Sequence, residues 1–158
     1  MFSVPLWSEE ICTRQQDKTS IFMYSKALIL SDDDHCKEFL IGVVFYNMAL
    51  VNHARAIETE KASLLTTALN FYDMAVAITQ SRDVDVGAFD YWLLLALYSN
   101  LAHIYLSRVC SEKLCQCLEG IRSLLAADKA EQVIDANDYY FFVANSLLQI
   151  RVDYAPAA

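Results

Sequence analysis

Glycine and proline are scarce in this chain, whose 158 residues include three glycines and two prolines. Pro5 and Pro156 lie near the two ends, so almost the whole chain is free of the residue that most strongly breaks helices. An all-β domain needs frequent turn residues, and this scarcity excludes one. The composition therefore predicts an all-α fold, and the length suits a single domain.

Basic side chains are also in the minority, with 12 Lys and Arg against 20 Asp and Glu and a formal net charge of −8. Binding to phosphate backbones depends on clustered Lys and Arg, so we expect no nucleic-acid partner. The longest apolar run, Tyr91 to Leu106, contains three polar residues and is shorter than the about 20 residues of a membrane span. We expect no membrane span and a buried helix at this place.

The five cysteines are an odd number and form no Cys-x-x-Cys motif, which fits neither a disulfide framework nor a zinc site. The start of the chain, MFSVPLWSEE, lacks the basic flank and the length of a secretory signal. Reduced thiols and no cleaved leader lead us to expect an intracellular, cytoplasmic protein.

Hydrophobic residues make up 56% of the chain and recur at intervals of three and four residues, as in amphipathic helices. This period predicts helices over about 37–57, 60–80, 88–108, 111–127 and 132–153. In the first helix, the residues expected to face inward are Leu40, Val43, Val44, Met48, Val51 and Ala54. The third helix is apolar nearly all round from Trp92 to Leu106, so neighbours should cover it on several sides.

The N-terminal part is harder to assign. Residues 1–20 show no sustained period and are expected to be irregular, and 154–158 form a tail. The run IFMYSKALIL at 21–30 fits either a helix or a short strand. A helix is favoured because Tyr24-x-x-Ala27-Leu28 repeats a pattern of the second helix, Tyr72-x-x-Ala75-Val76. It would bring the helical domain, 21–153, to about six helices.

Two parts of the chain carry similar helical-hairpin patterns. The first is Phe45-x-x-Met48-Ala49-x-x-Asn52 followed by Ala68-x-x-x-Tyr72-x-x-Ala75, and the second is Tyr98-x-x-Leu101-Ala102-x-x-Tyr105 followed by Leu114-x-x-x-Leu118-x-x-Ile121. These patterns resemble the tetratricopeptide repeat. The resemblance implies a right-handed stack of antiparallel hairpins, at about 37–80 and 88–127, with 132–153 as a C-terminal capping helix. Leu114 and Ile121 stand where the family has small residues, so small neighbours such as Ala102 should compensate.

In that family, the first helices of the hairpins line a concave face that holds a peptide or a helix. The matching positions are Val43, Tyr46, Asn47, Leu50, His53, Ala96, Ser99, Asn100, His103 and Leu106. The resemblance thus implies a non-catalytic interaction module or scaffold with a protein or peptide partner. Two alternatives stay open: these residues could pack against the capping helix, or the same apolar surface could join subunits of a homo- or hetero-oligomer.

Polar residues on this face suggest more than one role. Asn47 and Asn100 occupy equivalent positions of the two hairpins, where their amides could bond a partner's backbone or the chain's own loops. His53 and His103 have no second ligand at metal-binding spacing. The three glycines are too scattered for a phosphate-binding loop. We therefore expect no catalytic residues, metal or cofactor.

Overall fold

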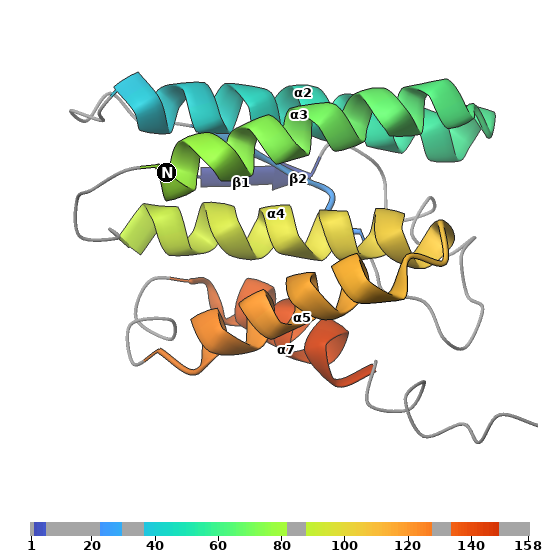
Figure 1. The fold of residues 1–158 in the computed structure, drawn as a ribbon. Helices are drawn as coiled ribbons and strands as arrows, with labels where there is room; N and C mark the ends of the chain where they lie inside the picture. Colours follow the sequence, from blue (N-terminus) through green and yellow to red (C-terminus); the bar gives the residue numbers. More distant parts are fainter. Residues whose placement is uncertain (1, 6–22, 30–36, 82–87, 128–133, 149–158) are drawn as a thin grey trace, which may run out of the picture.

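The structure, a computed structural model, describes residues 2–5, 23–29, 37–81, 88–127 and 134–148. These residues form five helices and one two-stranded sheet (Figure 1). The helices are α2 (Lys37–Thr59), α3 (Ala62–Gln80), α4 (Ala88–Ser107), α5 (Ser111–Leu125) and α7 (Ala136–Leu148). The mostly helical fold is confirmed, and each helix lies where the hydrophobic period predicts one. The outer parts of the expected last helix, 132–133 and 149–153, lie outside the described residues.

The helices pack as neighbours in chain order. Figure 1 shows α2 and α3 side by side at the top, α4 across the middle, and α5 and α7 below it. Besides its partner α5, α4 contacts α2, α3 and α7. Six successive residues of α4, from Trp92 to Leu97, are buried. The expectation of a helix covered on several sides is confirmed.

The inward face of α2 differs from the prediction. Val43 and Ala54 are buried as expected, but the other four predicted residues are between 36% and 54% exposed. These four are Leu40, Val44, Met48 and Val51. The stripe that faces the core is instead Phe39, Val43, Tyr46, Ala49, Leu50 and His53. Because α2 carries apolar residues on two faces, periodicity alone could not show which face is buried.

The helix favoured at 21–30 is wrong for the described part of that run. Residues 23–25 are extended, and Lys26–Ile29 form strand β2. This strand pairs antiparallel with β1 (Phe2–Pro5), with Phe2 opposite Ile29 and Pro5 opposite Lys26. The irregular assignment of 1–20 is therefore wrong at Phe2–Pro5 as well. A four-residue strand is too short for hydrophobic period to distinguish it from a helix.

The second hairpin is tight at Gly120. A Cβ atom added to Gly120 would lie 2.8 Å from Cε2 of Tyr98 on the facing helix. Leu114 and Ile121 of α5 are buried, as is Ala102 of α4. The close approach of α4 and α5 therefore depends on Gly120 of α5, a residue that the hairpin pattern does not include.

Candidate functional site

The ten residues predicted to line a groove all lie on α2 and α4, which contact each other. Asn47, His103 and Leu106 are partly buried, and the other seven are buried. The reason is that the chain itself covers this face. Residues 23–29 lie across it, and α7 adds a contact in which Asn145 Nδ2 donates a 2.8 Å hydrogen bond to Ser99 Oγ.

Two asparagines hold the extended segment 23–29 by its backbone. The Leu28 N–H donates to Oδ1 of Asn47 at 3.0 Å, and Nδ2 of Asn47 donates to the Leu28 carbonyl at 2.9 Å. In the same way, the Tyr24 N–H donates to Oδ1 of Asn100 at 2.7 Å, and Nδ2 of Asn100 donates to the Tyr24 carbonyl at 3.1 Å. Each side-chain amide thus satisfies both backbone groups of one residue.

The contacts of the two asparagines are to the backbone and depend on the conformation of the segment. A primary amide offers one acceptor and two donors, which match the N–H and C=O that an extended residue presents along one edge. Tyr24 and Leu28 are four residues apart, about 13 Å along an extended chain. Asn47 and Asn100 belong to adjacent parallel-running first helices, so their separation is set by helix packing. The pair therefore holds the chain's own segment at two points, four residues apart.

Two buried tyrosines support this segment, Tyr46 directly and Tyr72 through Asn100. The Tyr46 hydroxyl donates to the Lys26 carbonyl at 2.9 Å, and the Tyr72 hydroxyl accepts a 3.0 Å bond from Nδ2 of Asn100. Burial raises the pKa of both phenols well above the ordinary value, and the neighbouring Tyr72 raises that of Tyr46 further. Both hydroxyls are protonated at neutral pH and available as donors.

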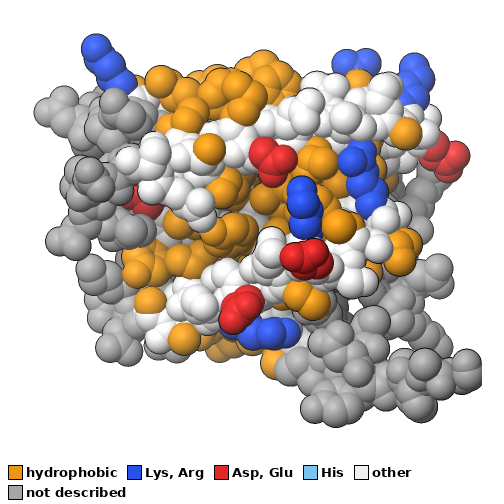
Figure 2. Space-filling view, viewed as in Figure 1, with side chains coloured by type: hydrophobic (Ala, Val, Ile, Leu, Met, Phe, Trp, Pro, Cys, Tyr) orange, Lys and Arg blue, Asp and Glu red, His pale blue; other side chains and the backbone are white. Residues whose placement is uncertain are grey.

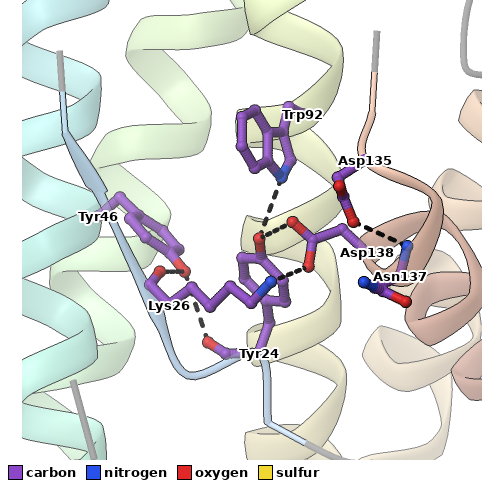
Figure 3. Close-up of polar contacts among 7 residues, drawn as sticks. All are labelled: Tyr24, Lys26, Tyr46, Trp92, Asp135, Asn137 and Asp138. Carbon is purple, nitrogen blue, oxygen red and sulfur yellow. Dashed lines mark hydrogen bonds and ion pairs between the residues drawn. The ribbon is translucent and has the colours of Figure 1, made fainter. Parts of the chain in front are cut away.

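The side chains of Tyr24 and Lys26 reach a buried carboxylate on α7 (Figure 3). The Tyr24 hydroxyl accepts from Nε1 of Trp92 at 3.1 Å and donates to Asp138 at 2.9 Å. Lys26 Nζ lies 2.6 Å from the other oxygen of Asp138, whose side chain is only 3% exposed. A carboxylate taken out of water needs such charged and hydroxyl partners.

The position of Asp138 follows from the local sequence. Asp135 accepts the Asn137 N–H at 2.8 Å and so caps the start of α7. Asp138 then stands in the first turn, where the free backbone N–H groups favour a negative charge. Asp138 therefore faces the segment 23–29 from the N-terminal end of α7.

His53 and His103 form a hydrogen-bonded pair between α2 and α4. His53 Nε2 lies 3.0 Å from Nδ1 of His103, and His53 Nδ1 lies 3.4 Å from the Tyr72 hydroxyl. The donor and acceptor roles of the two rings depend on their tautomers. If the Tyr72 hydroxyl donates to His53 Nδ1, His53 Nε2 carries its proton and donates to His103. In either direction, these contacts join Asn100, Tyr72, His53 and His103 in one continuous hydrogen-bonded chain.

Both imidazoles are neutral at physiological pH. Burial lowers the pKa of His53 well below its ordinary value, and the charge of a protonated His103 would lower it further. Burial also lowers the pKa of His103, to about 4. In the described ranges, no three His, Cys, Asp or Glu residues are grouped so as to hold a metal ion.

His103 also lines an open pocket of about 520 Å³ between the α2–α3 turn and the end of α4. Glu60, Lys61 and Arg108 contribute charged side chains to its wall. The pocket lies at the end of this hydrogen-bonded chain farthest from Tyr24. Ser107 also lines it, and its hydroxyl donates to the Ile104 carbonyl at 2.7 Å.

The sequence pattern identifies the two asparagines that hold the segment 23–29, but it does not identify the segment itself. Asn47 and Asn100 were singled out by their equivalent positions, whereas Tyr24, Lys26 and Asp138 were not predicted as parts of the site. A weak signal for Asp138 exists, since an acidic residue in the first turn of an otherwise apolar helix is well placed to face a cation. Nothing in the local sequence pairs His53 with His103.

Comparisons of the chain with known protein families, curated proteins and solved structures find no match in any of the three. In the described part of the chain, the stretch Phe39–Thr59 of α2 is the one helix long and apolar enough to cross a membrane by length and composition. Core helices of soluble proteins meet the same two criteria. The outer face of this helix is considered below.

Proposed function

We propose that this protein is a non-catalytic interaction module of the tetratricopeptide-repeat type, which holds an extended peptide on the face formed by α2 and α4. The observation that carries this proposal is the pair Asn47 and Asn100. They stand at equivalent positions of two hairpins, and each bonds both backbone groups of one residue in an extended segment. In this proposal the two hairpins stack in the right-handed sense of the family. The contacts of α4 to α2 and α3 support the part of this proposal that packs one hairpin against the other.

The segment 23–29 indicates which chemistry such a face accepts. Its backbone is held by amides and by the Tyr46 hydroxyl, and its Tyr24 and Lys26 side chains meet Trp92 and Asp138. A partner peptide of the same kind would be extended, with an aromatic hydroxyl and a cation two residues apart. In this proposal the partner's segment takes the place of 23–29, so the chain's own segment lowers the apparent affinity.

The alternative, a subunit that uses this same face to join an oligomer, has less support. Seven of the ten residues are buried within one chain, and the polar groups among them have partners there. A subunit interface in this place would require the segment 23–29 to leave first. The three cysteines of the described part, Cys110, Cys115 and Cys117, are free thiols, in keeping with an intracellular, cytoplasmic role.

The proposal can be tested with a fluorescent peptide of the sequence MYSKALI, residues 23–29, titrated with the full-length chain. Tyr24→Phe combined with Lys26→Met removes the contacts of the chain's own segment to Asp138 and keeps both asparagines. Fluorescence anisotropy should show this variant binding the peptide at least about tenfold more tightly than the unaltered chain, because the face is more often vacant. Circular dichroism first establishes that each variant is folded.

Two controls make the result specific. Asn100→Ala, added to the Tyr24→Phe and Lys26→Met variant, should abolish peptide binding. Asn52→Ala in the same background should leave binding unchanged, because Asn52 of α2 bonds its own helix at Met48. A peptide with proline in place of Tyr24 and Leu28 lacks the two N–H groups that the asparagines accept and should not bind. Binding that survives Asn100→Ala, or no binding to a folded variant, would overturn the proposal.

A further inference from the structure

The outer face of α2 carries an apolar stripe that is separate from the face just described. Leu40, Ile41, Val44, Met48 and Val51 are each between 36% and 54% exposed. In Figure 2, hydrophobic side chains gather along the upper edge of the molecule, over α2. These five side chains form one patch on the order of a few hundred Å², the size at which exposed apolar surface marks an interaction site.

The spacing of the stripe is that of a helix-pairing seam. The exposed residues Lys37, Ile41, Val44, Met48, Val51, Arg55 and Glu58 follow one another at alternating intervals of four and three. This 3.5-residue repeat keeps one line of side chains facing a second helix over its whole length. The line is about 30 Å long. Its centre is apolar. Lys37 lies at one end, and Arg55 and the terminal Glu58 lie at the other.

The neighbouring helix lacks such a stripe. Met74 of α3 is 45% exposed, but the other exposed residues of α3 are polar or alanine. Stacked helical hairpins need a polar outer face on their terminal members, and α2 as the first described helix of the stack does not have one. The segment 23–29 lies on the other face of α2, the face of Asn47 and Asn100.

We propose that this stripe pairs with the same stripe of a second copy of the chain, with the two α2 helices antiparallel about a two-fold axis near Met48. In that register, Met48 meets its own counterpart and Val44 meets Val51 of the second copy. Lys37 meets Glu58 of the second copy at both ends. The aliphatic stem of Arg55 covers Ile41 of the second copy. A parallel pairing would place Lys37 beside Lys37 and Glu58 beside Glu58, so the charges select the antiparallel one.

The size of the patch indicates how stable this dimer is. Standard stable interfaces bury about 800 Å² on each partner, and the apolar part here is about half of that. The dimer is therefore reversible, with a dissociation constant in the micromolar range. It leaves the face of α2 and α4 unobstructed, because the stripe lies on the opposite side of α2 from Tyr46 and His53.

Sedimentation velocity of the full-length chain, from low to high micromolar concentration, tests the proposal. A concentration-dependent monomer–dimer equilibrium is expected. Met48→Glu should raise the dissociation constant at least about tenfold, because each dimer would bury two unpaired carboxylates at its axis. Met74→Glu is the matched control, since Met74 has nearly the same exposure as Met48, 45% against 43%, and lies outside the stripe. It should dimerise like the unaltered chain.

Charge reversal tests the register. Lys37→Glu and Glu58→Lys should each weaken the dimer, and the double variant should restore it, because each chain again places opposite charges together. Three outcomes would overturn the proposal: a monomer throughout the concentration range, a dimer that Met48→Glu leaves unchanged, or a double variant weaker than either single one. The protein could also float with neutral phosphatidylcholine vesicles and lose this binding in Met48→Glu. That result would assign the stripe to lipid and would also overturn the proposal.

Discussion

Nε2 of His53 lies 3.0 Å from Nδ1 of His103, in the interior where α2 meets α4. The two ring centroids are 5.0 Å apart, and the pair is joined through Tyr72 to the asparagine that holds Tyr24. A proton added to either ring would bring a charge into this buried pair. The pair therefore limits how far the fold tolerates acid.

Stability should fall as the pH drops below about 6.5. The folded pKa of both histidines is lowered, to about 4 for His103, so between that value and 6.5 the unfolded chain binds more protons than the folded chain. Linkage then removes about 1.4 kcal/mol per pH unit for each histidine that stays neutral, or about 2 kcal/mol each between pH 7 and pH 5. Urea unfolding followed by circular dichroism at both pH values measures the loss.

The matched variant for this prediction is His53→Gln combined with His103→Gln, which removes both titrating groups. It should start less stable at pH 7, and its stability should fall much less toward pH 5. Equal losses in the two proteins would mean that the histidines are not the groups responsible.

Asn100→Ala should destabilise the fold more than Asn47→Ala. Asn100 is fully buried and makes three hydrogen bonds, so its removal leaves the Tyr24 N–H and C=O without those partners in the interior. Unsatisfied buried groups cost about 1–3 kcal/mol each, which for these two groups predicts a loss of at least about 2 kcal/mol. Asn47 is only partly buried, so water can replace it, and a loss of about 1 kcal/mol is expected. Chemical denaturation of both variants should show this order, and the reverse order would refute it.

Gly120→Ala should destabilise the second hairpin although alanine is the better helix former. The new methyl group would lie 2.8 and 2.9 Å from two carbons of the Tyr98 ring, so the ring or the helix must move. Overpacking of this kind costs about 1–3 kcal/mol, against a gain of about 1 kcal/mol in helix propensity. The midpoint of urea unfolding should fall. Combining Gly120→Ala with Tyr98→Leu should recover most of the lost stability. If it does not, the strain does not come from the Tyr98 ring.

Val109→Asn should stabilise the protein. Val109 closes the α4–α5 turn with a φ of 55°, a conformation that β-branched residues rarely adopt, and it is 85% exposed. Asparagine tolerates this conformation, and little packing is lost, so a gain of about 0.5–1 kcal/mol is expected. A rise in the thermal midpoint measures it. A fall would show that the exposed valine makes contacts that outweigh its backbone strain.

The helices were predictable because their signal is local. Few residues interrupt the hydrophobic period between Lys37 and Leu148, and all five expected helices are present. The buried face of α2 was not predictable in the same way. Ile41, Val44 and Met48 repeat as regularly as Val43, Tyr46 and Leu50, and only the position of α3 and α4 decides which line is covered.

The site was predictable only in part, because it depends on contacts between distant segments. The equivalent positions of Asn47 and Asn100 pointed to backbone binding, and the structure shows which backbone each one bonds. The strand at Lys26–Ile29 owes its conformation to those two side chains and to Phe2–Pro5. All of these partners lie outside the run 21–30, so a pattern within that run contains no sign of them. The spacing of its apolar residues favoured a helix instead.

The bond from Tyr24 to Asp138 spans 114 residues and has a consequence for biosynthesis. The N-terminal segment leaves the ribosome first, yet its binding site is complete only after α7, the last described helix, has emerged. Until then, Tyr24 and Lys26 are available to chaperones or to other chains. The contact between this early-made segment and α7 can therefore form only late in the production of the chain.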